Sequence, residues 1–330
     1  MMRNYRWGIV GLGWIAEKFA EGLQVLPDAQ LYAVASRTQV KADDFASRYK
    51  VPYAYGSYRN ILNNRSIDII YIATPHTLHY ENTMMCLDAG FPVLCEKPFA
   101  VNSFEVNKMI NKSKESGIFL MEAMWTAFLP SVKKVKGIIS EGLIGKVEFI
   151  RADFGIRADN NPKKRWFNKD LGGGSLLDAG IYPAYLALEI LGMPDNINAL
   201  ASIGPTGVDE NCGFIFQYKR GEIASLYSSI IAKTGIDAMI TGSKGSIHIH
   251  SNFFMPASVS VILDETEKDI TPEYIGNGYN YEAAEAMECL DKGFTEGISM
   301  NHEKSMMLIK ILDEIRKKCN IRYPKHDDKE

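Results

Sequence analysis

Two short groups of polar residues in this 330-residue chain have the types and spacing that could carry out chemistry. The first is Glu96-Lys97-Pro98, which directly follows Phe91–Cys95, an apolar run typical of a buried strand in a parallel sheet. Ligands of open α/β sheets bind beyond the carboxyl ends of the strands, so a lysine there can reach a bound molecule. Pro98 stiffens the exit of the strand. Taken alone, the tripeptide favours a solvated lysine at the end of a strand, and only the rest of the chain favours the functional interpretation.

The second group is Asp178 and Tyr182, four residues apart near the start of a helix expected at Ser175–Leu191. This spacing puts both side chains on one face of the helix. The preceding Gly172-Gly-Gly174 allows another chain segment or a ligand to approach closely, and Pro183 should kink the helix. The alternative is a capping aspartate and a half-buried core tyrosine.

The N-terminus carries the G-x-G-x-x-A form of a dinucleotide-binding turn, Gly11-Leu-Gly13-Trp14-Ile15-Ala16. An apolar strand precedes it, a helical pattern runs on to Leu26, and a second strand is expected at Gln30–Ser36. Gly11 permits the tight turn, Gly13 lets the backbone approach a pyrophosphate, and Ala16 allows close packing of helix on strand. The phosphates would lie at the helix N-terminus, which favours anions.

The end of the second strand predicts the cofactor. NAD-specific sheets place an acidic residue there to bind the ribose 2′-hydroxyl. This strand ends in Ser36-Arg37-Thr38, with no carboxylate before Asp43. A hydroxyl and a guanidinium suit a 2′-phosphate, so we expect NADP, with NAD the less favoured cofactor.

Composition describes an ordinary globular protein, with 46% hydrophobic and 23% charged residues. A net charge of −3 with dispersed signs argues against nucleic-acid binding. No apolar run approaches membrane-spanning length, and no signal peptide precedes the first strand, so we expect a cytoplasmic protein. The five cysteines lack disulfide-like or metal-type spacing and fit buried or incidental thiols in a reducing compartment.

The pattern of elements predicts an α/β chain with two domains. Residues 1–123 alternate strand and helix, which predicts a doubly wound parallel sheet of the Rossmann type. Residues 124–330 are β-rich with one long internal helix and two closing helices, which predicts an α+β domain with a large, mainly antiparallel open sheet. One apolar face of that sheet needs a cover, so we expect a homodimer, or a dimer of dimers, through it. Only the tail His326–Glu330 looks loose.

These motifs occur in an order that resembles that of the glucose–fructose oxidoreductase/inositol dehydrogenase (Gfo/Idh/MocA) family. The resemblance extends over nearly the whole chain. The motifs are the glycine turn, Thr74-Pro75 with His79, Glu96-Lys97-Pro98, and Asp178-x-x-x-Tyr182. Glu122-Ala-Met-Trp125-Thr and Gly172–Asp178 resemble the branch of dimeric dihydrodiol dehydrogenase and NADP-dependent D-xylose dehydrogenase. That branch has an arginine where this chain has Ala127, which puts the substrate in question.

The resemblance implies an NADP(H)-dependent oxidoreductase acting on a small sugar, polyol or diol, without a metal. It implies Lys97, Asp178 and Tyr182 as catalytic residues, and dimerisation through the second domain's sheet. Inositol-type members carry histidine at the position of Tyr182, so the resemblance leans towards aldoses and diols. The cofactor-binding set is Gly11, Gly13, Trp14, Ile15, Ala16, Ser36, Arg37, Thr74, Pro75, Leu78, His79, Glu96, Lys97, Arg165 and Trp166. The substrate-binding set is His79, Trp125, Phe154, Tyr182 and Tyr279.

The hydride chemistry also needs a group that moves the hydroxyl proton. Free tyrosine titrates near ~10, so a nearby ammonium such as that of Lys97 would be needed to favour the Tyr182 phenolate. Either residue could move the proton, and Asp178 could hold the lysine or orient the substrate. Arg165-Trp166 fits an exposed loop or a flap over the nicotinamide, and Tyr279 fits the site wall or core packing.

Three alternatives remain open. His76 and His79 could ligate zinc, but no further ligand with metal spacing accompanies them, and His248-Ile-His250 fits a surface pair without a role. A non-catalytic NADP-sensing regulator could use the same fold, although such proteins tend to lose the lysine at position 97. The third alternative is an enzyme that resembles biliverdin reductase and acts on a flat conjugated ligand.

Overall fold

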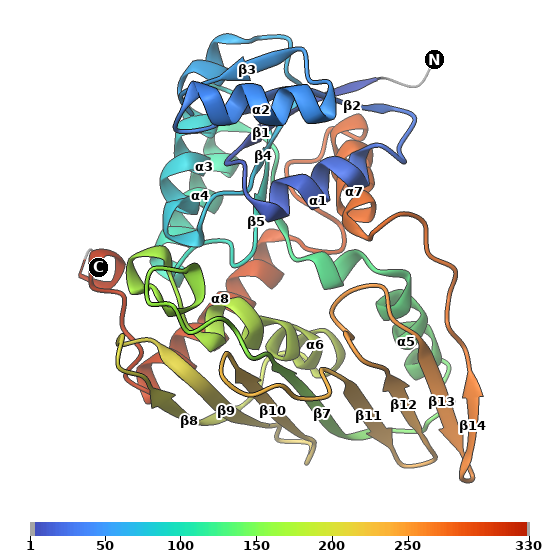
Figure 1. Cartoon of the computed structure of the whole chain (residues 1–330). Coiled ribbons are helices and arrows are strands. Elements are labelled where there is room, and N and C mark those ends of the chain that lie inside the picture. The colour runs from blue at the N-terminus through green and yellow to red at the C-terminus, as the bar shows by residue number, and fades with distance from the viewer. Residues whose placement is uncertain (1–3, 329–330) are drawn as a thin grey trace. The chain divides into compact units, whose positions relative to one another are not determined.

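The computed structural model describes residues 4–328, and the chain forms two compact units (Figure 1). Unit 1 consists of the described residues up to Ala100, together with Phe104–Phe128 and Ile275–Met306. Unit 2 consists of Val101–Ser103, Leu129–Tyr274 and the described residues from Met307 onward. Among residues 4–328, no helix has both the length and the apolar character that crossing a bilayer requires.

Unit 1 is built on a sheet of six parallel strands in the order β3-β2-β1-β4-β5-β6. The strands are β1 Tyr5–Val10, β2 Ala29–Ala35, β3 Tyr53–Tyr55, β4 Ile69–Ile72, β5 Val93–Glu96 and β6 Leu120–Ala123. The helices are α1 Trp14–Leu23, α2 Gln39–Tyr49, α3 His79–Asp88, α4 Ser103–Ser116 and α7 Tyr279–Asp291. The Rossmann sheet predicted from the alternating pattern is confirmed.

The central strands of unit 1 are buried on both faces, as helix-covered parallel strands must be. All four residues of β4 and of β5 are buried. Helix α1 turns Ala16, Phe19 and Leu23 inward. The methyl side chain of Ala16 is fully buried, which agrees with the close packing expected from the glycine turn.

Segment Ile275–Met306 belongs to unit 1, whereas the sequence indicated a single division between residues 123 and 124. Helix α7 packs on α1 within this unit: the Asn277 amide donates to the Lys18 carbonyl at 2.8 Å, and a Cβ atom at Gly22 would lie 2.9 Å from Tyr279 Cβ. The Tyr5 hydroxyl donates to Asp291 at 2.6 Å. Sequence order hides this return of the chain because the pairing residues lie at opposite ends of it.

Unit 2 is built on an eight-stranded sheet in the order β14-β13-β12-β11-β7-β10-β9-β8. Only the β7–β10 pair is parallel, so the mainly antiparallel sheet is confirmed. The strands are β7 Val147–Gly155, β8 Asn196–Ile203, β9 Asp209–Gln217, β10 Ile223–Ser229, β11 Ala238–Gly242, β12 Ser246–Ile249, β13 Val259–Leu263 and β14 Thr266–Asp269. The helices are α5 Pro130–Ser140, α6 Ile181–Leu191, α8 His302–Lys318, whose first residues belong to unit 1, and α9 Pro324–Asp327.

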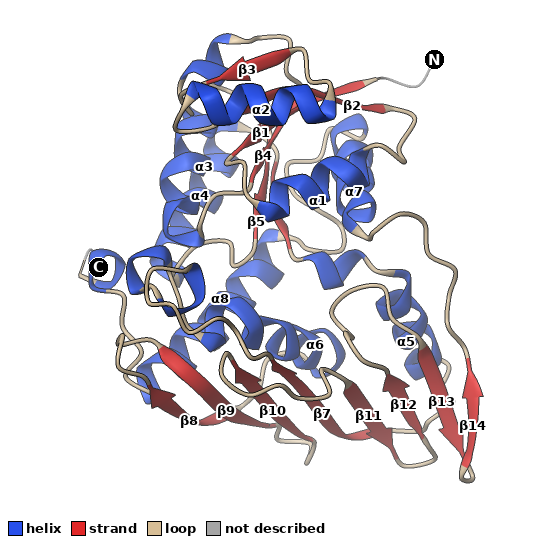
Figure 2. Ribbon diagram, viewed as in Figure 1, coloured by secondary structure: helices blue, strands red, loops and turns tan. Residues whose placement is uncertain are grey.

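The two faces of this sheet differ. Helices α5, α6 and α8 lie along one face (Figure 2), and side chains such as Ile150 and Ile240 are fully buried on that side. The opposite side exposes apolar side chains, including Leu200 at 83% and Ile215 at 46%. Strand β14 escaped the sequence patterns because all four of its residues are exposed and polar.

The helix expected at Ser175–Leu191 is divided. Leu176–Gly180 forms a π-helical turn, and α6 begins only at Ile181. Pro183 is the third residue of α6 and follows this wider turn directly.

The tail from His326 onward is not loose over its described part. Arg316 pairs with both oxygens of Asp327 at 2.6 and 2.7 Å, and His326 is buried. The end of the predicted loose segment, residues 329–330, lies outside the described residues.

Candidate active site

The glycine turn of unit 1 has the geometry that a pyrophosphate needs. Gly11 has a φ of +92°, and a Cβ there would lie 2.7 Å from the Thr74 methyl carbon, so no other residue fits. A Cβ at Gly13 would meet no atom within 4 Å. Gly13 also precedes α1 without a side-chain cap on the helix N-terminus. The turn thus leaves backbone open at a helix N-terminus, and a dinucleotide phosphate fits there.

His79 joins the exits of two neighbouring strands. Its Nδ1 lies 2.8 Å from the Pro98 carbonyl oxygen beyond β5, and its Nε2 lies 2.9 Å from the Thr74 carbonyl oxygen beyond β4. Asn82 supports the same loop by donating to Thr74 Oγ1 at 3.1 Å. His79 therefore fixes the strand ends that carry Thr74 and Lys97.

Lys97 follows β5 directly, and Glu96 anchors its backbone. Glu96 Oε2 accepts from the Lys97 N–H at 3.1 Å, and Glu96 Oε1 accepts from the Tyr71 hydroxyl. The Tyr71 ring stacks on Phe19 of α1, with ring centroids 3.6 Å apart. A buried network of strand and helix residues therefore positions the lysine predicted from the sequence.

Two more buried carboxyl groups belong to this part of unit 1. Burial raises the pKa of Glu122 to about 7, and the neighbouring Glu96 adds to the shift while Lys97 opposes it. Glu122 accepts from the Phe99 N–H at 2.9 Å. Burial also raises the pKa of Glu282 well above its usual range, with the charge of Glu96 as the second cause. Burial and the neighbouring Glu96 thus both favour the protonated form of Glu282.

Trp125 and Tyr279 stack on each other inside unit 1, with ring centroids 4.3 Å apart and an angle of 26° between the planes. Both side chains are buried, at 6% and 3% exposure. Tyr279 thus packs in the core, one of its two predicted roles. Ala127 lies in the same 3₁₀ turn as Trp125 and is buried.

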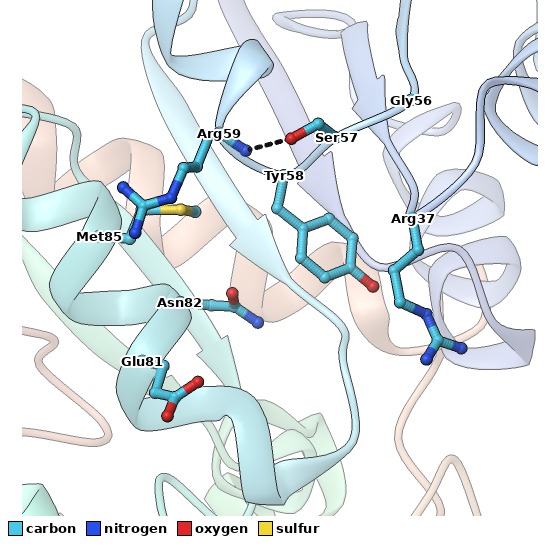
Figure 3. Close-up of a pocket in the computed structure, with 8 residues that line it drawn as sticks. All are labelled: Arg37, Gly56, Ser57, Tyr58, Arg59, Glu81, Asn82 and Met85. Atoms are coloured by element: carbon cyan, nitrogen blue, oxygen red, sulfur yellow. Dashed lines mark hydrogen bonds between the residues drawn. The ribbon is translucent and has the colours of Figure 1, made fainter.

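A pocket of about 460 Å³ lies in unit 1, and Arg37 is one of its lining residues (Figure 3). Tyr58 and Arg59, which follow β3, line it as well, with Glu81 and Asn82 of α3. Partial burial raises the pKa of the Tyr58 hydroxyl, and the Arg37 guanidinium acts against this shift. Two guanidinium groups and a phenol thus line one hollow, together with a single carboxylate.

In unit 2, Asp178 is buried and pairs with Arg165. The Arg165 side chain is 40% exposed, so the pair has one buried and one accessible partner. Trp166 packs against the buried cluster of Phe167, Val208 and Ile230. The turn that carries Arg165 and Trp166 is therefore attached to the core of unit 2.

The three glycines before Asp178 let other chain segments approach. The Gly174 N–H donates to the Trp166 carbonyl at 3.0 Å, and the Tyr323 hydroxyl donates to the Gly173 carbonyl at 2.8 Å. Asp209 accepts from the Leu176 N–H at 2.7 Å and from the Ser175 hydroxyl at 2.9 Å, which fixes the start of the π-helical turn. Burial raises the pKa of Asp209 to about 6.

Tyr182 lies in an aromatic cluster of unit 2. Its ring centroid is 5.5 Å from that of Phe154 in β7 and 4.8 Å from that of Phe254 in the loop after β12. Phe154 and Phe254 stack at 4.3 Å. A stacked pair of phenylalanine rings thus packs against the tyrosine ring.

The structure brings most predicted unit 1 residues to the carboxyl ends of its strands. Trp14 is exposed and Ile15 half-buried at the start of α1, and Ser36 is buried after β2. Pro75 precedes a short 3₁₀ turn before α3, and Leu78 is the last residue of that turn. Sequence reasoning missed the supporting residues. These are Tyr58, Arg59, Tyr71, Asp209, Phe254 and Glu282. Each is separated from its partner by a long stretch of sequence or lies in a loop, and no local pattern marks such residues.

Comparison with known proteins agrees with this construction. Residues 5–124 match the model described as "Oxidoreductase family, NAD-binding Rossmann fold", and residues 132–248 match the GFO/IDH/MocA C-terminal domain. The chain belongs to the Gfo/Idh/MocA family of oxidoreductases. It is an NAD(P)-dependent dehydrogenase or reductase, and the predicted family is confirmed.

The curated relatives include trans-1,2-dihydrobenzene-1,2-diol dehydrogenase of Xenopus tropicalis, 37% identical over 97% of this chain and 99% of the relative. The human enzyme of that name is 34% identical, with coverage of 97% and 98%. Among solved structures, an aldose-aldose oxidoreductase from Caulobacter crescentus superposes with a TM-score of 0.86 at 25% identity, over 96% of this chain and 98% of that one. A 3-ketoreductase from Actinomadura kijaniata bound to NADP shares the fold, with a TM-score of 0.83 at 22% identity over 96% and 98%.

Proposed function

We propose that this oxidoreductase is NADP(H)-dependent and acts on a hydroxyl or carbonyl group of a sugar, polyol or diol. The observation that carries the proposal is the position of Lys97, which follows β5 and is anchored by Glu96. The exit of β5 is joined through His79 to the exit of β4, beside the glycine turn. A lysine at the cofactor-binding edge suits an oxygen that gains negative charge.

The bound nicotinamide supplies or accepts the hydride, and side chains of this protein handle the proton and the charge. The Lys97 ammonium polarises the reacting oxygen. Tyr182, held by Phe154 and Phe254, exchanges the hydroxyl proton as general acid and base. Asp178, which pairs with Arg165, orients a second hydroxyl of the substrate. This second contact favours polyhydroxylated molecules over simple alcohols.

The cofactor preference rests on the pocket lined by Arg37 and Arg59. A 2′-phosphate would receive charge-assisted hydrogen bonds from these guanidinium groups. The buried Ser36 and exposed Arg37 occupy the place where NAD-specific chains carry an acid.

The exposed apolar side of the unit 2 sheet supports a homodimer, because apolar patches of this kind mark interfaces. The five free cysteines, four of them buried, support a reducing cytoplasmic location.

The experiment is a screen of NADP⁺ and NAD⁺ reduction against aldoses, polyols and trans-dihydrodiols. We expect turnover of at least one of these classes, with a higher kcat/KM for NADP⁺. The rival function, a regulator that senses NADP, predicts NADPH binding without turnover of any member of the panel. Turnover of a linear tetrapyrrole alone would favour a biliverdin-reductase-like enzyme.

A further inference from the structure

A second group of chemically active side chains lies in unit 2, on strands β12 and β14. His248, His250 and Glu267 each offer one ligand atom, and these atoms lie within 4.8 Å of one another. We propose that the three residues bind a divalent transition-metal ion of the Zn²⁺ or Co²⁺ type. This proposal is independent of the reaction proposed above.

The alternation of β12 explains why both histidines are available. Ile247 and Ile249 are fully buried, so the period of two puts His248 and His250 on the other side of the sheet. The two imidazole rings lie 4.0 Å apart between centroids. Strand pairing continues to His250, whose N–H donates to the Ser258 carbonyl at 2.9 Å. The backbone under both ligands is therefore fixed.

Glu267 reaches the histidines from the edge strand. In the register of the sheet, Ile262 of β13 pairs with Ser246 on one side and with Glu267 on the other. Glu267 therefore lies on the same side of the sheet as the two rings, and its Oε1 is 3.5 Å from His250 Nε2. Zinc bonds of ~2.0–2.2 Å in a tetrahedron put ligand atoms about 3.3 Å apart.

Asp237 supplies the outer support that metal-binding histidines usually have. The distance from His248 Nε2 to Asp237 Oδ2 is 2.7 Å, and Asp237 is itself held by Arg151 at 2.8 and 3.2 Å. When His248 donates its Nε2–H to this carboxylate, Nδ1 keeps the lone pair that a metal ion takes. A carboxylate behind the imidazole fixes the ring and raises its basicity.

The charges around the group also favour a cation. Asp153 and Asp237 lie against Arg151, and Glu267 lies beside His250. Two carboxylates, those of Asp237 and Glu267, therefore contact the imidazole pair, and Arg151 is the positive side chain paired with Asp237.

The competing interpretation is a surface network without an ion, in which His248 and His250 serve only as hydrogen-bond partners of Asp237 and Ser260. Both interpretations fit the same side-chain geometry, but only the metal site predicts saturable metal binding by these three side chains. Glu267 lies on another strand, outside the pattern His248-Ile-His250. The sequence alone therefore gave the two histidines no role.

The test is titration of tag-free, chelator-treated protein with Co²⁺ and Zn²⁺, followed by visible absorption and calorimetry. We expect one ion per chain, visible bands of a low-coordinate cobalt site, and a rise in Tm with Zn²⁺ concentration. A cobalt–thiolate charge-transfer band must be absent, which separates this site from binding at Cys212 or Cys319. His250→Ala and Glu267→Gln should each weaken binding at least about tenfold, and Asp237→Asn by about 10- to 100-fold.

Glu265→Gln is the matched control, because Glu265 is an exposed residue of the same hairpin. It should bind like the wild type. The proposal fails if the wild type takes up no ion at about 1 mM metal, far above the Kd expected of a three-ligand zinc site. It also fails if His250→Ala and Glu267→Gln bind as tightly as Glu265→Gln.

Discussion

Lys97 owes its position to a buried carboxyl group and to strand geometry. Glu96 accepts from its backbone N–H, and the Tyr71 hydroxyl holds Glu96 from the other oxygen. Tyr182 packs against two phenylalanine rings of unit 2. At the scale of single residues, the proposed chemistry depends on the side chains that surround these two residues.

Tyr182→Phe should lower kcat by roughly two to four orders of magnitude, which is typical of removing a general acid or base. The ring remains, so its contacts with Phe154 and Phe254 should keep the fold intact. Steady-state kinetics together with the Tm check both parts. A variant that loses activity only because it unfolds would make Tyr182 a structural residue.

Arg37→Ala should reduce kcat/KM for NADP⁺ by roughly 10- to 100-fold and leave that for NAD⁺ nearly unchanged, because a charge-assisted hydrogen bond contributes about 1.5–3 kcal/mol. Arg59→Ala should act in the same direction, since Arg59 lines the same pocket. Lys41→Ala, a nearby exposed cation on α2, is the control. Equal losses with both cofactors would point to adenine stacking rather than to the 2′-phosphate.

Glu96, Glu122 and Glu282 are buried in unit 1. For Glu122, this burial makes the free energy of unfolding depend on pH. The pKa of Glu122 rises from its ordinary value of 4.5 to about 7. An acid with a raised pKa in the folded state favours folding while protonated, so the stability it contributes is complete below pH ~4.5 and lost as the pH rises towards 7. By linkage the loss reaches about 3 kcal/mol.

Glu122→Gln should remove this pH dependence while keeping the acceptor for the Phe99 N–H. Relative to the wild type, we expect the variant to gain up to about 3 kcal/mol between pH 5 and pH 8. Denaturant unfolding at several pH values measures the difference. Exposed Glu115→Gln should show no such gain, and equal behaviour of the two variants would mean that Glu122 is charged in the folded protein.

The sequence predicted a strand or turn well where the residues of that element alone show the typical pattern. The glycine turn, the strand before Lys97 and the alternation of β12 are examples. Local patterns failed where the structure depends on distant partners, as for α7 on α1 or Asp209 at the π-helical turn. They also failed for β14, because an exposed polar strand has no apolar alternation to mark it.

At the scale of the whole molecule, the sheet of unit 2 presents apolar side chains that a single chain leaves exposed. Leu200 is 83% exposed, and Ile215 and Ile223 on the neighbouring strands β9 and β10 are 46% and 42% exposed. Burying such side chains stabilises association by roughly 25 cal/mol for each Å² of apolar surface. This surface therefore gives the proposed dimer its most direct physical basis.

Leu200→Asp combined with Ile215→Asp should shift the protein from dimer to monomer, because two charges per chain would be desolvated at the interface. Sedimentation velocity over a range of concentrations measures the change. Val40→Asp, at an exposed apolar position of α2 in unit 1, is the control and should remain dimeric. A wild type that is monomeric at all concentrations would remove the dimer from this account.

The most direct test of the central claim is Lys97→Ala, measured for NADPH binding and for turnover of the best substrate from the panel. The account predicts that NADPH binds within a few-fold of the wild-type Kd, because the glycine turn and Arg37 remain, while turnover falls to background. Lys108→Ala on α4 is the control for removing a lysine from unit 1. Turnover within a few-fold of wild type in Lys97→Ala would contradict the account and leave Lys97 a solvated residue at the end of a strand.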